Sequence, residues 1–166
     1  ATIRRQRQMC IRDSFYPASA IKTCAAVSAA LYAQELDVPL ETELRYHPLF
    51  EDEELDELDA SNLAGGRITI GHEIRKLFLV SDNRAYNRLY EFVGHDRLQR
   101  DMERAGIPAR NRHRLSEFRT PADNLRTPRI DYRKPAGEWK TLDARTGKLA
   151  SKNEGLAGLD LSLIHI

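Results

Sequence analysis

The stretch SAIKTCAAVSAALYAQEL, residues 19–36, carries small or apolar side chains on nearly every side of the helix that it predicts. A helix of that composition is typical of the centre of a domain and not of its surface. Pro17 precedes the stretch, and a proline is tolerated near a helix start. We therefore expect the rest of the domain to be arranged around a central helix over residues 19–36.

Three more helices are predicted further along the chain. Residues 69–79 have helical periodicity, with Thr69 as a candidate N-terminal cap. The periodicity is interrupted at residues 81–83 and resumes over residues 84–93, where Gly94 offers a stop. Residues 96–105 suit another helix, with Asp96 as the expected N-cap.

Extended structure is predicted in fewer places. Residues 41–48 fit a short strand or extended segment, and residues 129–146 fit a hairpin around Pro135–Gly137. The acidic stretch 51–59 predicts a solvated helix face or loop, and residues 61–66 predict a turn. Residues 107–133 are rich in Pro, Arg and Asn and predict irregular structure. The chain is therefore expected to be mostly helical, with a loop-rich C-terminal part.

The two ends of the chain differ from its middle. A DNA sequence that encodes LSLIHI, residues 161–166, has a reverse complement that encodes QMCIRDS, residues 8–14. Ends related in this way resemble the adapter used in preparing sequencing libraries. We therefore expect residues 1–14 and 161–166 to lie outside the natural protein. Residues 15–160 would then be one domain or most of one, with both natural termini missing.

Composition gives no sign of a nucleic-acid or membrane partner. Without the charged residues of 1–14, the formal net charge falls from +1 to −2, and no apolar run approaches the length of a membrane span. Cys24 is the one cysteine outside the adapter-like ends, which leaves no intrachain disulfide. The histidines show no metal-ligand spacing, so no metal or other cofactor is predicted; they stand at positions 47, 72, 95, 113 and 165.

Ser19 and Lys22 form the first candidate catalytic pair. Residues three apart lie on one face of a helix, so Ser-x-x-Lys places an amine beside a hydroxyl. A hydroxyl is a weak nucleophile that needs a neighbouring base, and burial against an apolar helix lowers the pKa of a lysine until it can serve as one. Alone, this pattern occurs by chance in roughly half of chains of this size, and a capping Ser before a surface Lys would look the same.

The second signal is Ser81-Asp82-Asn83, between two predicted helices. A given tripeptide of this kind occurs by chance in about one chain in fifty of this length. A plain capping turn would also use these residue types. The two patterns together, in this order and in helical settings, are much more specific than either one.

YPASAIK, residues 16–22, and LVSDNRAYNRLYEFVG, residues 79–94, resemble the first two motifs of the serine β-lactamase and penicillin-binding protein superfamily, in its class A-like branch. The resemblance covers about residues 15–115. It implies an α/β (α+β) β-lactamase/transpeptidase-like parent fold, of which this chain would hold mainly the helical subdomain and little of the sheet.

The resemblance also implies roles for individual residues. Ser19 would be the acylated nucleophile, and its backbone N–H would supply half of the oxyanion hole. Lys22 would activate Ser19 directly or through a water, and Ser81 would relay a proton toward the leaving nitrogen. Asn83 would hydrogen-bond the substrate amide and Lys22, while Asp82 would anchor the loop. No cofactor is needed for this reaction.

The chain departs from the motif pattern of this superfamily in two places. The third motif, Lys-Thr-Gly, has only a stand-in, RTGK at residues 145–148, which we interpret as a polar turn after the hairpin. Glu117 lies at the right distance beyond Ser81 for the carboxylate that supports deacylation, but its surroundings do not match, and pairing with an Arg neighbour is the alternative. Because the chain ends before a third motif, we expect it to be inactive or nearly so.

The predicted function is therefore a β-lactamase-type serine hydrolase acting on a small-molecule β-lactam or peptidoglycan-like amide or ester. A peptidoglycan peptidase or esterase of the same superfamily is the alternative. By resemblance, the protein would be a periplasmic or secreted monomer. Eight basic residues between positions 110 and 134 also allow a nucleic-acid-binding module, but aromatic side chains are sparse there, so an Arg-rich loop paired with carboxylates is favoured.

Overall fold

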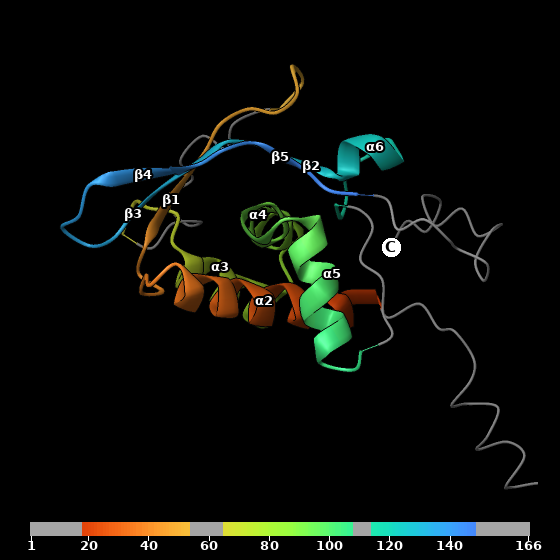
Figure 1. Cartoon of the computed structure of the whole chain (residues 1–166), viewed down its shortest axis with the longest axis horizontal. Coiled ribbons are helices and arrows are strands. Elements are labelled where there is room, and N and C mark those ends of the chain that lie inside the picture. The colour runs from red at the N-terminus through yellow and green to blue at the C-terminus, as the bar shows by residue number, and fades with distance from the viewer. Residues whose placement is uncertain (1–17, 54–64, 108–113, 149–166) are drawn as a thin grey trace, which may run out of the picture.

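The computed structural model describes residues 18–53, 65–107 and 114–148. Its helices pack beneath a small antiparallel sheet, so the chain has a mixed, α+β architecture (Figure 1). The adapter-like ends, and most of the acidic stretch 51–59 and of the turn 61–66, lie outside the described residues.

The expected central helix is present. It is α2, Ile21–Glu35, preceded by a single 3₁₀ turn, η1, Ala18–Ala20. Small residues such as Ala25 and Ala29 are fully buried on α2, which lets the neighbouring helices approach closely. One side of α2 is nevertheless exposed, with Val27 at 53% and Leu31 at 47% of full exposure. The expectation of a helix buried all round is therefore wrong on that side.

Two helices follow in the predicted places. α3 covers Ile70–Val80, and the Thr69 hydroxyl accepts a hydrogen bond from the His72 N–H, which confirms Thr69 as its cap. α4 covers Asn83–Val93 and ends at Gly94 as predicted. α4 is the most buried element of the core, and it lies between the sheet and α2 in Figure 1.

α5 corrects the predicted start of the fourth helix. It covers His95–Arg104 and has Gly94, not Asp96, as its N-cap. Gly94 has φ 82° and joins α4 directly to α5, so the new helix begins one residue early. Asp96 lies inside the first turn, where its carboxylate accepts the Lys148 N–H at 2.8 Å.

The sheet has the strand order β1-β3-β4. β1 is Glu43–Tyr46, β3 is Ile130–Arg133 and β4 is Trp139–Leu142. β3 and β4 form the predicted hairpin, and β1 pairs antiparallel with β3, with Leu44 opposite Tyr132. Because alternate residues share a face, Leu44, Ile130 and Tyr132 all point into the core.

Residues 107–133 are less irregular than expected. Besides β3 they hold the short helix α6, Pro121–Asn124, and the strand β2, Arg126–Thr127. β2 pairs with β5, Arg145–Thr146, as a separate two-stranded ribbon. Each strand of this ribbon is two residues long, which is too short to show an alternation of apolar and polar residues in the sequence. Its pairing is set by contacts between segments that are distant in sequence.

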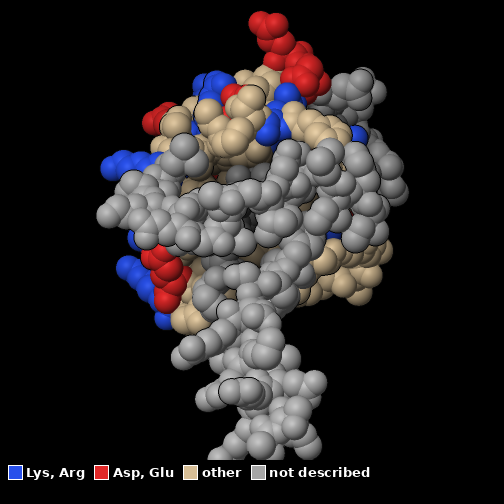
Figure 2. Space-filling view, turned by 90° about the vertical axis from the view of Figure 1, so that its right-hand side faces the viewer, with Lys and Arg blue, Asp and Glu red and all other residues tan. Residues whose placement is uncertain are grey.

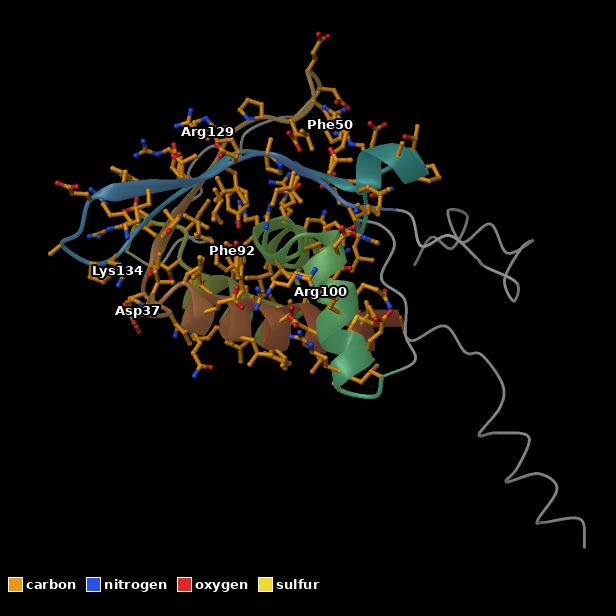
Figure 3. All side chains as sticks on the ribbon, viewed as in Figure 1. Asp37, Phe50, Phe92, Arg100, Arg129 and Lys134 are labelled. Atoms are coloured by element: carbon orange, nitrogen blue, oxygen red, sulfur yellow. The ribbon has the colours of Figure 1, made fainter. Side chains whose placement is uncertain are left out.

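The core lies between the sheet and the helices. Phe92 occupies this position in Figure 3, and its ring lies 5.1 Å from that of Tyr32 on α2. At one end of the molecule, the Lys134 ammonium in the β3–β4 turn lies 3.1 Å from the carboxylate of Asp37, which follows α2 (Figure 3). These contacts join the two layers at the centre and at one end.

Candidate active site

Ser19, Lys22 and Ser81 lie together at the N-terminal end of α2. The Lys22 ammonium donates to the Ser81 hydroxyl oxygen at 2.9 Å and also to the Ser81 carbonyl oxygen. The Ser81 hydroxyl in turn donates to the Ser19 hydroxyl oxygen at 3.2 Å. Ser81 therefore connects the Lys22 amine to Ser19, the candidate nucleophile. The spacing of Ser19 and Lys22 along the helix does not by itself predict this connection.

The turn that carries Ser81 is held in an unusual conformation. Ser81 ends α3 with φ 54° and ψ 41°, the left-handed region, which a non-glycine residue enters at a cost of about 1–2 kcal/mol. Asp82 follows it and caps α4 by accepting the Ala85 N–H at 2.8 Å. Asp82 also pairs with Lys76 at 3.2 Å. These contacts give Asp82 the anchoring position that the resemblance implies, and they fix the direction of the Ser81 side chain.

Burial sets the electrostatics of Lys22. Its side chain belongs to the second residue of α2, and only 2% of the residue is exposed. Desolvation lowers the pKa of Lys22 below its ordinary value, while the nearby Asp82 carboxylate opposes that shift. A lysine in this state gives up its proton more readily than a surface lysine, as a general base must.

Asn83 begins α4 but does not reach Lys22 as expected. Its side-chain amide donates to the Ser116 hydroxyl at 2.6 Å, whereas the hydrogen bonds of Lys22 go to Ser81. Ser116 has φ 58°, also in the left-handed region. The first turn of α4 is thereby tied to the segment around residue 116.

Asn87 was not singled out from the sequence, yet it connects Glu117 to the same helix. Its side-chain amide nitrogen donates to the Glu117 carboxylate at 2.7 Å and to the Leu115 carbonyl at 2.9 Å. Its amide oxygen accepts the Leu115 N–H at 2.7 Å. Asn87 stands one helical turn after Asn83, so the spacing alone places both amides on one face of α4.

Glu117 also lies among arginines. Its second carboxylate oxygen is 3.9 Å from Arg114 Nε and 3.8 Å from Arg119 Nε. The Arg neighbours named as the alternative partners of Glu117 are therefore present. The Glu117 carboxylate nevertheless lines a cleft that also includes Asn83. The geometry therefore fits both a deacylating carboxylate and a carboxylate paired with arginine.

This cleft has a volume of about 360 Å³. Its lining is mostly polar and charged and comes from β1 and the loop after it, from α4, from the segment 115–119 and from Pro128. The lining residues are Tyr46, His47, Asp52, Glu53, Asn83, Arg84, Asn87, Arg88, Glu91, Leu115, Ser116, Glu117, Arg119 and Pro128. Asn83 connects it to the Ser81 turn.

RTGK, residues 145–148, has a structural position. Arg145 donates to the carbonyl oxygens of Glu91, Phe92 and Val93 at 2.7, 2.9 and 3.1 Å, so its guanidinium caps the C-terminal end of α4. Arg145 and Thr146 form β5 and not a plain turn. The Arg145 side chain is therefore committed to the end of α4 opposite to the one that carries Asn83.

The basic residues after position 110 are largely paired with carboxylates. Arg114 is buried and bonds Glu91 at 2.8 Å. The other pairs are Arg119–Asp52, Arg126–Asp123, Arg129–Asp131, Arg133–Glu43 and Lys134–Asp37. Figure 2 shows basic and acidic side chains interspersed on the described part of one side. The described part of this run thus forms ion pairs, as the favoured alternative predicts; Arg110 and Arg112 lie outside it.

The described residues lack the features of two other kinds of site. They contain no group of three or more His, Cys, Asp or Glu side chains arranged to hold a metal ion. Within the same residues, no helix has the length and apolar character needed to cross a membrane.

Comparison with known proteins adds an independent finding. A model of the beta-lactamase enzyme family matches residues 7–153, a range that contains Ser19, Lys22 and Ser81. The matched range also takes in residues 7–14, which resemble adapter sequence. No curated protein and no solved structure matches the chain. Since the family model covers most of its length, the chain belongs to the beta-lactamase enzyme family.

Proposed function

We propose that this member of a hydrolase family transfers an acyl group to Ser19, with Lys22 and Ser81 moving the proton. The observation that carries the proposal is the hydrogen-bonded series from Lys22 through Ser81 to Ser19. A buried amine, a relay hydroxyl and an exposed nucleophile hydroxyl are the parts that serine acylation without histidine requires.

The acylation step follows from that order. The Ser19 oxygen forms a bond to the carbonyl carbon of the substrate, and its proton passes to Ser81 while the Ser81 proton passes to neutral Lys22. The carbon–nitrogen bond then breaks, and a proton returns from Lys22 through Ser81 to the leaving nitrogen. The proton lost by Ser19 thus ends on the leaving nitrogen, and Ser81 and Lys22 return to their starting protonation states, so no outside acid or base is consumed.

Deacylation needs a water and a base. We assign the base to Glu117, because one of its oxygens accepts from Asn87 while the other makes no hydrogen bond within the described residues. That oxygen takes a proton from water as the water oxygen attacks the Ser19 ester. The ester bond breaks, the acid leaves, and the proton held by Glu117 passes to the Ser19 oxygen, so both groups return to their starting states.

The substrate that fits the resemblance is a β-lactam or a related peptidoglycan-like amide or ester. A peptidase or esterase would use Ser19, Lys22 and Ser81 in the same way. We also propose, from the resemblance, that the protein acts as a monomer in the periplasm or outside the cell.

Labelling of Ser19, which needs a single acylation of each molecule and no turnover, tests the proposal. The chain and a Ser19→Ala variant are incubated with a labelled penicillin and with a fluorophosphonate, and the modified residue is located by mass. Modification of Ser19 by both reagents, absent in the variant, supports a penicillin-recognising enzyme. Modification by the fluorophosphonate alone supports the esterase or peptidase. If neither reagent modifies Ser19, the acyl-transfer proposal is wrong.

A further inference from the structure

The cleft beside Asn83 has a lining that an apolar group would not match. Most of the lining residues carry a carboxylate, a guanidinium group or an amide, and Tyr46, Leu115 and Pro128 add apolar surface beside them. Two charged members of the lining, Arg88 and Glu91, are under 10% exposed and paired with Glu73 and Arg114 respectively. A hydrocarbon group entering the cleft would strip water from these groups and return no hydrogen bond.

Arg119 offers the cleft an unused donor. Its Nη1 is engaged by both oxygens of Asp52, at 2.8 and 2.9 Å, but its Nε is buried and has no hydrogen-bond partner within the described residues. The nearest carboxylate oxygen, on Glu117, stands 3.8 Å away, which is too far for a hydrogen bond. A buried N–H without an acceptor is uncommon in a native fold, and a ligand oxygen is one group that satisfies it.

Acceptors stand on the same wall. Asp52 and Glu53 line the cleft and come shortly after Phe50, which is labelled in Figure 3. The centre of the Phe50 ring lies 4.1 Å from the Arg119 guanidinium carbon, so this loop packs against Arg119. The Asp52 side chain is 72% exposed, and an exposed ion pair of this kind is weak enough to be rearranged by a ligand. The wall therefore presents positive and negative groups side by side.

We propose that this cleft binds a zwitterionic, amino-acid-like side chain of the substrate, in preference to a hydrocarbon or aromatic one. Arg119 Nε would donate to a carboxylate or carbonyl oxygen, and the exposed Asp52 carboxylate would accept from an ammonium group. The assignment rests on the proposed function, since Asn83 at the edge of the cleft places the bound group next to the Ser81 turn. Glu117 stays available to a water.

The preference of the cleft for a polar group over an apolar one does not depend only on the attraction between opposite charges. A site that is built to hydrogen-bond a polar group rejects an apolar analogue strongly, because the polar groups of the site are then left unpaired. An apolar pocket discriminates much less between ligands of similar size. Arg119 is therefore the residue that determines specificity, and it acts on binding without taking part in bond making.

Binding of small fragments tests the inference without any chemistry at Ser19. Glycylglycine carries an amine, an amide and a carboxylate, whereas benzyl alcohol carries an aromatic ring and neither an ammonium nor a carboxylate. Each is titrated into the Ser19→Ala variant to roughly 10 mM, where a fragment with a millimolar Kd occupies most sites. The side-chain amide resonances of Asn83 and Asn87 are followed by NMR.

We expect glycylglycine to shift both resonances with an affinity at least about tenfold higher than that of benzyl alcohol. Arg119→Gln should weaken glycylglycine by about tenfold. The matched control is Arg126→Gln, which also removes a guanidinium near Phe50 but does not line the cleft, and it should leave the affinity within about twofold. Equal binding of the two fragments, no shift with either, or equal loss in both variants would overturn the inference. Failure of Ser19 labelling, by contrast, would overturn the proposed function and leave this result standing.

Discussion

Lys22 and Ser81 stand 59 positions apart in the sequence, yet the Lys22 ammonium donates to the Ser81 hydroxyl at 2.9 Å. The same Ser81 hydroxyl reaches Ser19 at 3.2 Å, which makes Ser81 the link between the proposed base and the proposed nucleophile. The position depends on the left-handed backbone at Ser81 and on the Asp82 cap that follows it. The chemistry at Ser19 is therefore sensitive to a turn in another part of the chain.

The rate at which a fluorophosphonate labels Ser19 should rise with pH. Neutral Lys22 is the active form, and burial lowers its pKa, so the rate should level off below pH 10.5, the ordinary lysine pKa. Lys22→Arg should reduce the rate by about 10²–10⁴-fold at every pH, because a guanidinium does not deprotonate in this range. An unchanged rate in Lys22→Arg would remove Lys22 from the mechanism.

Ser81→Ala and Ser81→Gly should both slow labelling of Ser19, because each removes the relay hydroxyl. The two variants should differ in stability. Glycine accepts φ 54° without strain and alanine does not, so Ser81→Gly should be more stable to urea than Ser81→Ala by about 1 kcal/mol. Equal stability would mean that the left-handed turn does not persist in solution.

Glu117→Gln should separate the two halves of the reaction. Ser19 should still be acylated by labelled penicillin, but the acyl-enzyme should decay about 10²-fold or more slowly, since the base for the attacking water is gone. Its half-life is measured by mass after the free reagent is removed. Glu138→Gln, in the exposed β3–β4 turn, is the matched control and should decay at the parent rate. Slow decay in both variants would contradict the assignment.

Arg145→Met should lower the free energy of unfolding by about 2–4 kcal/mol, because the guanidinium donates to three carbonyl oxygens at the end of α4. Measured at a temperature where the variant is folded, the rate of Ser19 labelling should match that of the parent chain. A folded variant of parental stability that no longer labels would instead make RTGK part of the active site.

The buried pair of Glu73 and Arg88, 3.0 Å apart, predicts a non-additive response. Burial raises the pKa of Glu73 to about 7, so denaturation is measured above that pH, where the carboxylate is ionised. Glu73→Gln should cost about 3–5 kcal/mol by leaving Arg88 without its carboxylate. Adding Arg88→Met should restore much of that loss. If the double variant is no more stable than Glu73→Gln, the pair is not coupled as its geometry indicates.

Several features of the fold follow from the sequence alone. The helix over residues 19–36, the Thr69 cap, the stop at Gly94 and the hairpin around Pro135–Gly137 are all present as predicted. Each depends on contacts within a few residues, so the local pattern contains the information that is needed. The direct contact expected between Ser19 and Lys22 is not of this kind: Ser19 lies in the 3₁₀ turn before α2, and its hydrogen-bonded link to Lys22 runs through Ser81.

Tertiary structure decided the rest. The pairing of β1 with β3, the Arg145 cap on α4 and the Asn87 contact with Glu117 each join segments that are at least 30 positions apart. Short-range periodicity carries no information on such partners, since they are selected by which layers pack and which buried polar groups still need hydrogen bonds. For the same reason, the sequence could propose a serine and a lysine as reactants, but only packing of α3 against α2 placed the Ser81 hydroxyl between them.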